Sequence, residues 1–192
     1  MVIVAILVGI LACGVVIGLV MRPRVRAAQD AFAEQVRALV VRTGWRPDHD
    51  PVPPLQATFV TLDDVLGSTS HHGISANLRL AGQWRGVEVR VLQLRYRTAN
   101  VATVRAATMV LVPRPAPGPS LTVRGGGDTA ALAMLPPAVA HHLAADPRMR
   151  DRTLFFTAEH LAAVFPGEVI DQDATIATAD LLADLTQRLG IR

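Results

Sequence analysis

The first 21 residues form one uninterrupted apolar run, and this run constrains the fold more than any other part of the chain. Residues 1–21 contain no charged residue and no proline. Twenty helical residues rise about 30 Å, which matches the thickness of the hydrocarbon core of a bilayer. The run therefore predicts one transmembrane helix over residues 2–21, followed by a domain that begins at Arg22.

A cleaved signal peptide is the competing interpretation of this run. It would need basic residues before an apolar stretch of about 7–15 residues and a small-x-small cleavage site. No arginine or lysine precedes the run here, and the run is longer than such a stretch. A lipid-attachment site at Cys13 would need a small residue where Leu11 stands. An uncleaved anchor is the interpretation that fits best.

Arginines follow the apolar run at once, and they predict its orientation. We expect Arg22, Arg24 and Arg26 to lie at the membrane interface. Because positive charges favour the cytoplasmic side, the expected location is the inner (plasma) membrane, with the C-terminal domain in the cytoplasm. From Arg22 to Arg105, 12 Arg against 7 Asp and Glu give +5, a balance that suits either an anionic lipid surface or an ordinary solvated face.

Small residues recur at a spacing of four within the run. Gly14 and Gly18 form a GxxxG pair, which lets two helix backbones approach closely. These glycines are candidate helix–helix contacts of a homodimer. The competing explanation is that glycine is common in membrane helices in any case.

The rest of the chain predicts an α+β fold. Apolar periodicity indicates an amphipathic helix over residues 25–43 with Gly44 as its C-cap. Strands are expected next, over residues 55–62, 74–80, 87–96, 101–112 and 121–123. In residues 87–96 the apolar side switches partway along, which could mark a bulge or a strand that passes from the edge to the interior.

Helices are predicted after the strands. The expected helices cover residues 137–145, 158–165 and 174–189, with a short strand over 153–157 and with Thr157 as a helix cap. The predicted fold class is therefore α+β, with one N-terminal transmembrane helix followed by a single domain that has a mainly antiparallel sheet and C-terminal helices. The expected boundaries are 1–21 for the membrane helix, 22–44 for a juxtamembrane amphipathic helix and 45–192 for the globular domain.

Residue usage excludes several kinds of chemistry. All 19 basic residues are arginine, so no lysine can form a Schiff base or serve a lysine-dependent phosphate loop. The single cysteine lies in the apolar run, which excludes an intradomain disulfide. No HExxH motif, Cys–His set or EF-hand loop is present, and the adjacent histidine pairs 71–72 and 141–142 are poorly placed to share one ion. We predict no catalytic residue, no metal site and no cofactor.

Three weaker patterns could indicate catalysis or phosphate binding, but each has an ordinary structural explanation. Ser68, Thr69 and Ser70 precede the histidines at 71–72, but adjacency supplies none of the geometry of a catalytic triad. The pair Glu159 and His160 could meet carboxylates at 171 and 173, yet helix surfaces carry such charges routinely. Residues 124–128 (RGGGD) resemble a phosphate-binding nest only superficially, and a turn is the simpler reading.

Nucleic-acid binding is not expected despite the pI of about 10.3. Arginines of the predicted strands could cluster on one sheet face: Arg85, Arg90, Arg95, Arg97 and Arg105. Interleaved aromatic side chains, on which bases would stack, are limited to Trp84 and Tyr96 in this part of the chain.

Short motifs of the chain resemble a group of uncharacterised actinobacterial membrane-anchored proteins with a domain of unknown function. The residues that carry the resemblance are 44–46 (GWR), 83–86 (QWRG), 143–148 (LAADPR) and 179–189 (ADLLADLTQRL). The resemblance implies one N-terminal membrane helix and a following domain, and it implies no activity. Trp45 and Trp84 are expected to be core residues more than ligand platforms.

The sequence alone favours a membrane-tethered cytoplasmic interaction module, a scaffold or accessory domain without catalytic activity that binds another protein. The expected partners are the lipid bilayer and a protein, which could itself be a membrane protein. Two alternatives stay open. One is a membrane-associated, hydrolase-like enzyme that uses the loop at residues 68–72, and the other is a lipid or small-molecule sensor.

Overall fold

A computed structural model describes residues 23, 26–49, 75–98, 101–167 and 170–190. The chain divides into two compact units, one up to Ala38 and one from Leu39 onward. The described residues of the first unit, 23 and 26–38, are helical, the helix continues to residue 43, and Arg26 is exposed. All strands and the remaining helices belong to the second unit.

The helix over residues 26–43 ends at Gly44, as the sequence predicts. Gly44 has a φ of +71°, a left-handed conformation that glycine adopts without steric cost, and its N–H donates to the Val40 carbonyl oxygen at 2.8 Å. The chain then turns so that Trp45 is buried, with 1% of its surface exposed. Its ring meets that of Trp84 edge to face at a centroid distance of 5.9 Å.

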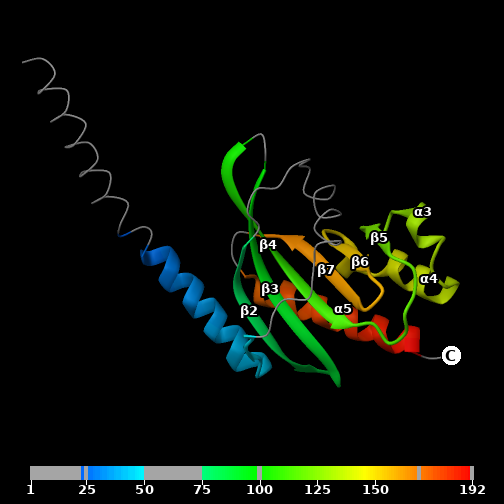
Figure 1. Ribbon diagram of the computed structural model, residues 1–192, viewed down its shortest axis with the longest axis horizontal. Helices are drawn as coiled ribbons and strands as arrows, with labels where there is room; N and C mark the ends of the chain where they lie inside the picture. Colours follow the sequence, from blue (N-terminus) through cyan, green and yellow to red (C-terminus); the bar gives the residue numbers. More distant parts are fainter. Residues whose placement is uncertain (1–22, 24–25, 50–74, 99–100, 168–169, 191–192) are drawn as a thin grey trace, which may run out of the picture. The chain divides into compact units, whose positions relative to one another are not determined.

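Seven antiparallel strands form one sheet in the order β1-β2-β3-β4-β7-β6-β5 (Figure 1). Strands β6 and β7 follow two helices in the chain, but β7 pairs with β4 and β6 pairs with β7. The sheet therefore combines strands from both halves of the unit. The strands are β1 (Arg46–Pro47), β2 (Ser75–Trp84), β3 (Val87–Thr98), β4 (Val101–Pro113), β5 (Leu121–Arg124), β6 (Thr153–Phe156) and β7 (His160–Pro166).

Strand β3 explains the switch of apolar side seen in the sequence. Its pairing with β4 is regular from Arg90 to Arg97, but its pairing with β2 shifts register between Ala76 and Leu78, opposite Leu94 and Gln93, so an irregularity does lie beside the switch. Residues 91–94 are all buried, because this part of β3 lies in the sheet interior with both faces covered. The side chains on one face join an apolar cluster that consists of Leu92, Leu94, Tyr96, Ala107, Met109, Leu111, Phe155, Ala162 and Val164.

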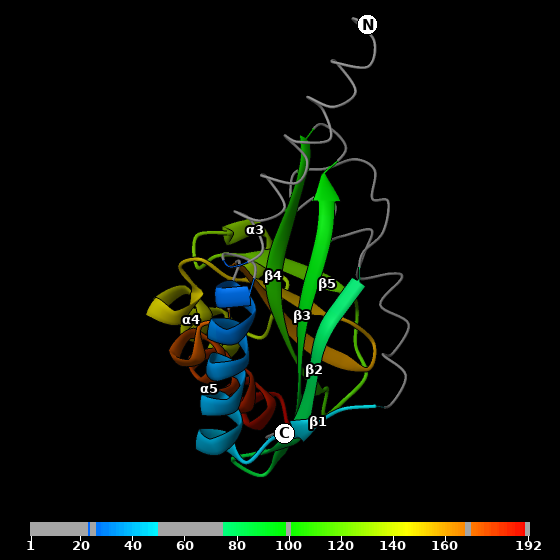
Figure 2. The same cartoon turned by 90° about the vertical axis from the view of Figure 1, so that its left-hand side faces the viewer.

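Helices cover the other face of the sheet, and Figure 2 shows α4 and α5 on the same side of it. The helices are α3 (Thr129–Leu132), α4 (Pro137–Ala145), the 3-10 turn η1 (Pro147–Met149) and α5 (Gln172–Gly190). The predicted bounds of α4 are confirmed, and α5 extends its prediction by a residue or two at each end. The buried residues of α5 are Thr175, Ile176, Thr178, Ala179, Leu181, Leu182, Ala183 and Leu185.

The helix predicted over residues 158–165 is wrong, since this segment is strand β7. Thr157 does accept a hydrogen bond from the N–H of His160 through its hydroxyl oxygen, at 2.9 Å, as a helix cap would. The N–H of Thr157 also donates to the carbonyl oxygen of His160, which closes a tight turn between β6 and β7 instead. Because β7 lies between β4 and β6, it is apolar on both faces and lacks the alternation that identifies a strand.

The predicted fold class is corrected in its first element. The structure is α+β with a seven-stranded antiparallel sheet, but none of its described helices is long and apolar enough to cross a membrane. The longest helix in this part, α5, carries three aspartates and an arginine. The span predicted over residues 2–21, with Gly14, Gly18, Arg22 and Arg24, lies outside the described residues. The inner-membrane location stays a prediction.

Candidate functional site

The loop at residues 68–72, the one catalytic candidate around a serine and histidines, lies outside the described residues. Elsewhere in the part that the structure describes, no group of three or more metal-ligating side chains comes together. His141 is exposed, whereas His142 is partly buried and points its Nε2 toward Asp146 at 3.6 Å. The adjacent histidines therefore point in different directions, as neighbours on a helix should.

The other sequence candidates take structural roles. At the end of β5, the N–H of Arg124 donates to Asp128 and the N–H of Gly125 donates to the Arg152 carbonyl oxygen. These two donors are occupied, so residues 124–128 form a turn and not an open nest for phosphate. Asp128 in turn caps α3 through the N–H of Ala131.

The carboxylates near Glu159 and the strand arginines do not gather into sites. Glu159 lies in the turn between β6 and β7, whereas Asp171 caps α5 through the N–H of Ala174 and Asp173 pairs with Arg42. Arg90 and Arg95 are five residues apart on one extended strand, so their side chains leave opposite faces of the sheet. A single basic face, which nucleic-acid binding would need, is not formed by these two arginines.

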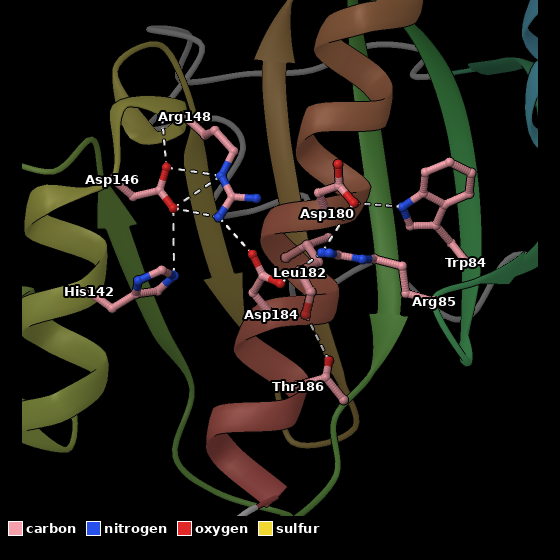
Figure 3. Close-up of polar contacts among 9 residues, drawn as sticks. All are labelled: Trp84, Arg85, His142, Asp146, Arg148, Asp180, Leu182, Asp184 and Thr186. Atoms are coloured by element: carbon pink, nitrogen blue, oxygen red, sulfur yellow. Dashed lines mark hydrogen bonds and ion pairs between the residues drawn. The ribbon is translucent and has the colours of Figure 1, made fainter.

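The densest polar cluster joins α4, α5 and the turn between β2 and β3 (Figure 3). Asp146, between α4 and η1, accepts from Arg148 at both oxygens: Oδ1 lies 3.0 Å from Nε and Oδ2 lies 2.6 Å from Nη2. The same Nη2 lies 2.8 Å from Oδ2 of Asp184 on α5. Arg148 therefore ties the α4–η1 junction to α5 with a bidentate ion pair and a second carboxylate.

Both charges of this pair are stabilised in the folded state. The hydrogen bond from Arg148 holds the pKa of Asp146 below its usual value, although burial acts in the opposite direction. The hydrogen bond to Asp146, followed by the one to Asp184, raises the pKa of Arg148. The carboxylate is therefore a fixed anion near neutral pH and is unsuited to accept a proton as a general base.

The second half of the cluster centres on the turn between β2 and β3. Arg85 Nη1 lies 2.9 Å from Oδ1 of Asp184 and 3.4 Å from Oδ1 of Asp180. Asp180 also accepts a hydrogen bond from Trp84 Nε1 at 3.0 Å. Arg85 has a φ of +51° and Gly86 a φ of +81°, so the turn keeps an arginine in a conformation that suits glycine or asparagine better.

Every carboxylate of the cluster has an arginine partner, and the one hydroxyl among the residues drawn is engaged elsewhere. Thr186, the hydroxyl shown in Figure 3, donates to the carbonyl oxygen of Leu182 within α5. A hydrolytic site would need a hydroxyl or thiol held against a base, and a third group that orients the base. The cluster lacks that arrangement, so we assign it to fastening the helices to the sheet.

A pocket of about 460 Å³ lies at the other end of α5. This volume is within the usual range for sites that bind small ligands or side chains of a partner. Three segments far apart in the sequence form its walls: the loop between β4 and β5, the link between α3 and α4, and the last turn of α5. The lining residues are Arg114, Ala116, Pro117, Gly118, Pro119, Leu121, Met134, Leu135, Pro136, Phe156, Arg188 and Leu189.

Arg114 is held in this wall by neutral groups. Its Nη1 donates to the carbonyl oxygens of Thr157 at 2.7 Å and Pro119 at 3.1 Å, and its guanidinium lies 5.9 Å from the ring centre of Phe156. A Cβ on Gly118 would stand 2.2 Å from Nη2 of Arg114, so only glycine leaves room for the guanidinium at that place. The side chain is thus fixed, and no carboxylate among the described residues pairs with it.

Arg188 supplies the second positive charge of the pocket. It is exposed in the last turn of α5, where it also faces the negative end of the helix dipole. None of the residues that line the pocket is acidic, and none of the described carboxylates forms an ion pair with Arg114 or Arg188. Met134, which also lines the pocket, exposes 67% of its surface. The pocket is therefore apolar, positively charged and open to an anionic group.

The sequence does not reveal this pocket, because none of the segments that line it carries a recognisable motif. The loop at residues 114–119 carries no motif, and Leu189 is the last residue of the helix predicted over residues 174–189. The sequence gives no signal for Arg188, because Asp184 precedes it by four residues and would be taken as its helical partner, whereas the fold pairs Asp184 with Arg85 and Arg148. No family model, curated protein or solved structure matches this chain, so the resemblance to actinobacterial membrane-anchored proteins stays a prediction.

Proposed function

We propose that this chain is a non-catalytic binding module, and that the pocket at the end of α5 receives an apolar, negatively charged segment of a partner protein. The observation that carries the proposal is the pairing of an apolar wall with two arginines that have no carboxylate partner among the described residues. A cation beside an apolar surface selects ligands that combine an apolar body with an anionic group.

The charge of the pocket favours a binding role over a purely structural one. Arg188 differs from three other arginines of the second unit, which bridge elements. Arg85 and Arg148 are neutralised by aspartates, and Arg152 lies over the Phe165 ring while it donates to Thr178 and to the Ala174 carbonyl oxygen. Arg188 makes no such structural contact, so fastening elements together does not account for it.

The test is a selection of random seven-residue peptides on the immobilised full-length chain, kept in mild detergent because residues 1–21 are apolar. We expect the selected peptides to combine glutamate or aspartate with leucine, isoleucine or phenylalanine. Binding of the selected peptides should weaken about tenfold or more in Arg188→Glu, since the reversed charge repels their carboxylates.

The matched control is Arg150→Glu, which makes the same charge change at an exposed arginine outside the pocket. This variant should retain the affinity within about twofold, because exposed charges at a distance are screened by salt. Equal losses in the two variants, or selected peptides without acidic residues, would contradict the proposal. Tight binding of dodecanoate with no selected peptide would instead favour a small-molecule sensor.

A further inference from the structure

Strand β5 forms one edge of the sheet and borders the pocket. It is the last strand in the sheet order, and its described partner is β6 alone. Leu121, its first residue, lines the pocket together with Phe156, the residue opposite it on β6. The sheet edge and the pocket are therefore neighbouring parts of one surface.

The hydrogen bonds at the end of β5 show which backbone groups point outward. The N–H of Gly125 donates inward to the Arg152 carbonyl oxygen, whereas the N–H of Arg124 donates to Asp128 on its own side of the strand. In an antiparallel strand the backbone groups of successive residues point to opposite sides. Leu121 and Val123 therefore face β6, and the N–H and C=O of Thr122 face away from it.

Among the described residues, no group outside the β5–β6 ladder makes a hydrogen bond to the N–H or C=O of Thr122. Ser120, two residues earlier and exposed, falls on the same side and would extend the edge. An unpaired strand edge is a template for an added strand. Native edges are commonly protected by charged side chains, and here Arg124 is exposed while Pro119 ends the edge at the other side.

We infer that the partner segment binds as an extended strand that pairs with β5 at Thr122 and places alternate side chains in the pocket. This inference rests on the proposed function and names the conformation of the partner and the edge that holds it. Backbone hydrogen bonds provide affinity in such strand addition, and the pockets for every second side chain provide specificity.

Alternation and charge define the sequence that such a segment needs. Side chains two residues apart on a strand lie about 7 Å apart on one face, so two neighbouring apolar side chains can enter the pocket together. Leu121, Phe156 and Met134 are apolar residues of the pocket lining that such side chains would contact. An acidic side chain or the terminal carboxylate at the end of the segment would meet Arg114 or Arg188.

The test uses the tightest of the selected heptapeptides and two analogues of it, each N-methylated at alternate amide nitrogens. In strand addition only one set of amides donates to β5. One analogue should therefore lose binding at least about tenfold, while the other binds within about threefold of the parent. Equal effects of the two methylation patterns would overturn the inference.

Two variants of the full-length chain test the edge from the other side. Thr122→Pro removes an outward N–H that the β5–β6 ladder does not use, so peptide binding should fall at least about tenfold. Thr122→Val keeps the donor and the β-branched shape, and it should bind like the wild type. The thermal unfolding midpoint of each variant shows that loss of binding is not loss of fold.

The outcomes separate the two proposals. If Arg188→Glu weakens peptide binding but Thr122→Pro does not, strand addition is wrong and the charged pocket stands. If Thr122→Pro alone weakens binding, the edge binds peptide and the role given to the pocket is wrong. If no acidic, apolar peptide is selected at all, both proposals fail.

Discussion

Replacing Asp146 by asparagine tests the bidentate ion pair between Asp146 and Arg148. The carboxylate exposes 5% of its side-chain surface and accepts from Arg148 at both oxygens, as well as from the backbone N–H of Arg148 at 2.9 Å. Asparagine has nearly the same shape and keeps one acceptor for that N–H. It puts an amide NH₂ or a neutral oxygen against the guanidinium and removes the negative charge.

The expected cost can be bounded from the geometry. A hydrogen bond to a charged group contributes about 1.5–3 kcal/mol, and breaking a fully buried ion pair costs about 3–5 kcal/mol. Arg148 is only partly buried, with 24% of its side chain exposed, and it retains Asp184 as a partner. We therefore expect Asp146→Asn to lower the free energy of unfolding by about 2–3 kcal/mol. For a domain of this size, that loss lowers Tm by about 4–12 °C.

The lowered pKa of Asp146 predicts how this loss of stability changes with pH. The folded-state pKa of Asp146 lies below its unfolded value of 3.8, so the unfolded state binds the proton more readily. The stabilisation is therefore complete above pH 3.8 and is lost as the pH falls through the lower folded-state pKa. The gap in stability between wild type and Asp146→Asn should be constant near neutral pH and should close below pH 3.8.

Urea unfolding followed by tryptophan fluorescence measures this gap, because Trp84 contacts the same cluster through Asp180. Asp184→Asn is the matched control, since its carboxylate is 28% exposed and its two arginines have other partners. Solvent screening should limit that loss to about 1 kcal/mol. The reasoning is refuted if Asp146→Asn costs less than the control, or if its effect is as large near pH 3 as at neutral pH.

Three further substitutions test the packing of the described unit and the pocket. Gly82→Ala places a Cβ 2.5 Å from Cδ1 of the buried Trp45, so it should destabilise the fold by about 1–3 kcal/mol in urea unfolding. Trp84→Phe keeps a ring but loses the hydrogen bond to Asp180, and it should cost about 0.5–1.5 kcal/mol in the same assay. Gly118→Ala should displace Arg114 from its carbonyl partners and weaken peptide binding, as isothermal titration with a selected peptide would show, while Tm falls only slightly.

The helices that the sequence predicts well have either a characteristic residue at one end or a regular apolar period. Proline at the start of α4 fits the first turn of a helix, and the apolar periodicity of α5 repeats over several turns. Gly44 likewise marks the end of the helix over residues 26–43 through its left-handed backbone. Each of these signals lies within the element or at its end, so it can be found without knowing what packs against the element.

The helix prediction for residues 158–165 was wrong for the opposite reason, because the structure of this segment depends on what packs against it. The run from Leu161 to Phe165 is buried on both sides between β4 and β6, so its apolar pattern carries no period that separates strand from helix. The hydroxyl of Thr157 makes the same bond to an N–H three residues later in a helix cap and in this hairpin turn. Only pairing with β4, which lies about fifty residues earlier in the chain, decides the outcome.

The candidate site shows that the net charge of a segment does not predict the charge of a pocket that the segment helps to form. From Asp146 to Arg192, 5 Arg against 8 Asp and Glu give a net charge of −3, which points to an acidic surface. Several of these carboxylates form ion pairs within the fold. Asp146 pairs with Arg148, and Asp184 pairs with both Arg148 and Arg85. Arg188 lies in the same stretch without such a partner, and Arg114, from a distant loop, joins it at the pocket. A positive pocket therefore forms within an acidic segment, because ion pairing cancels charge by contact in space and not by position in the sequence.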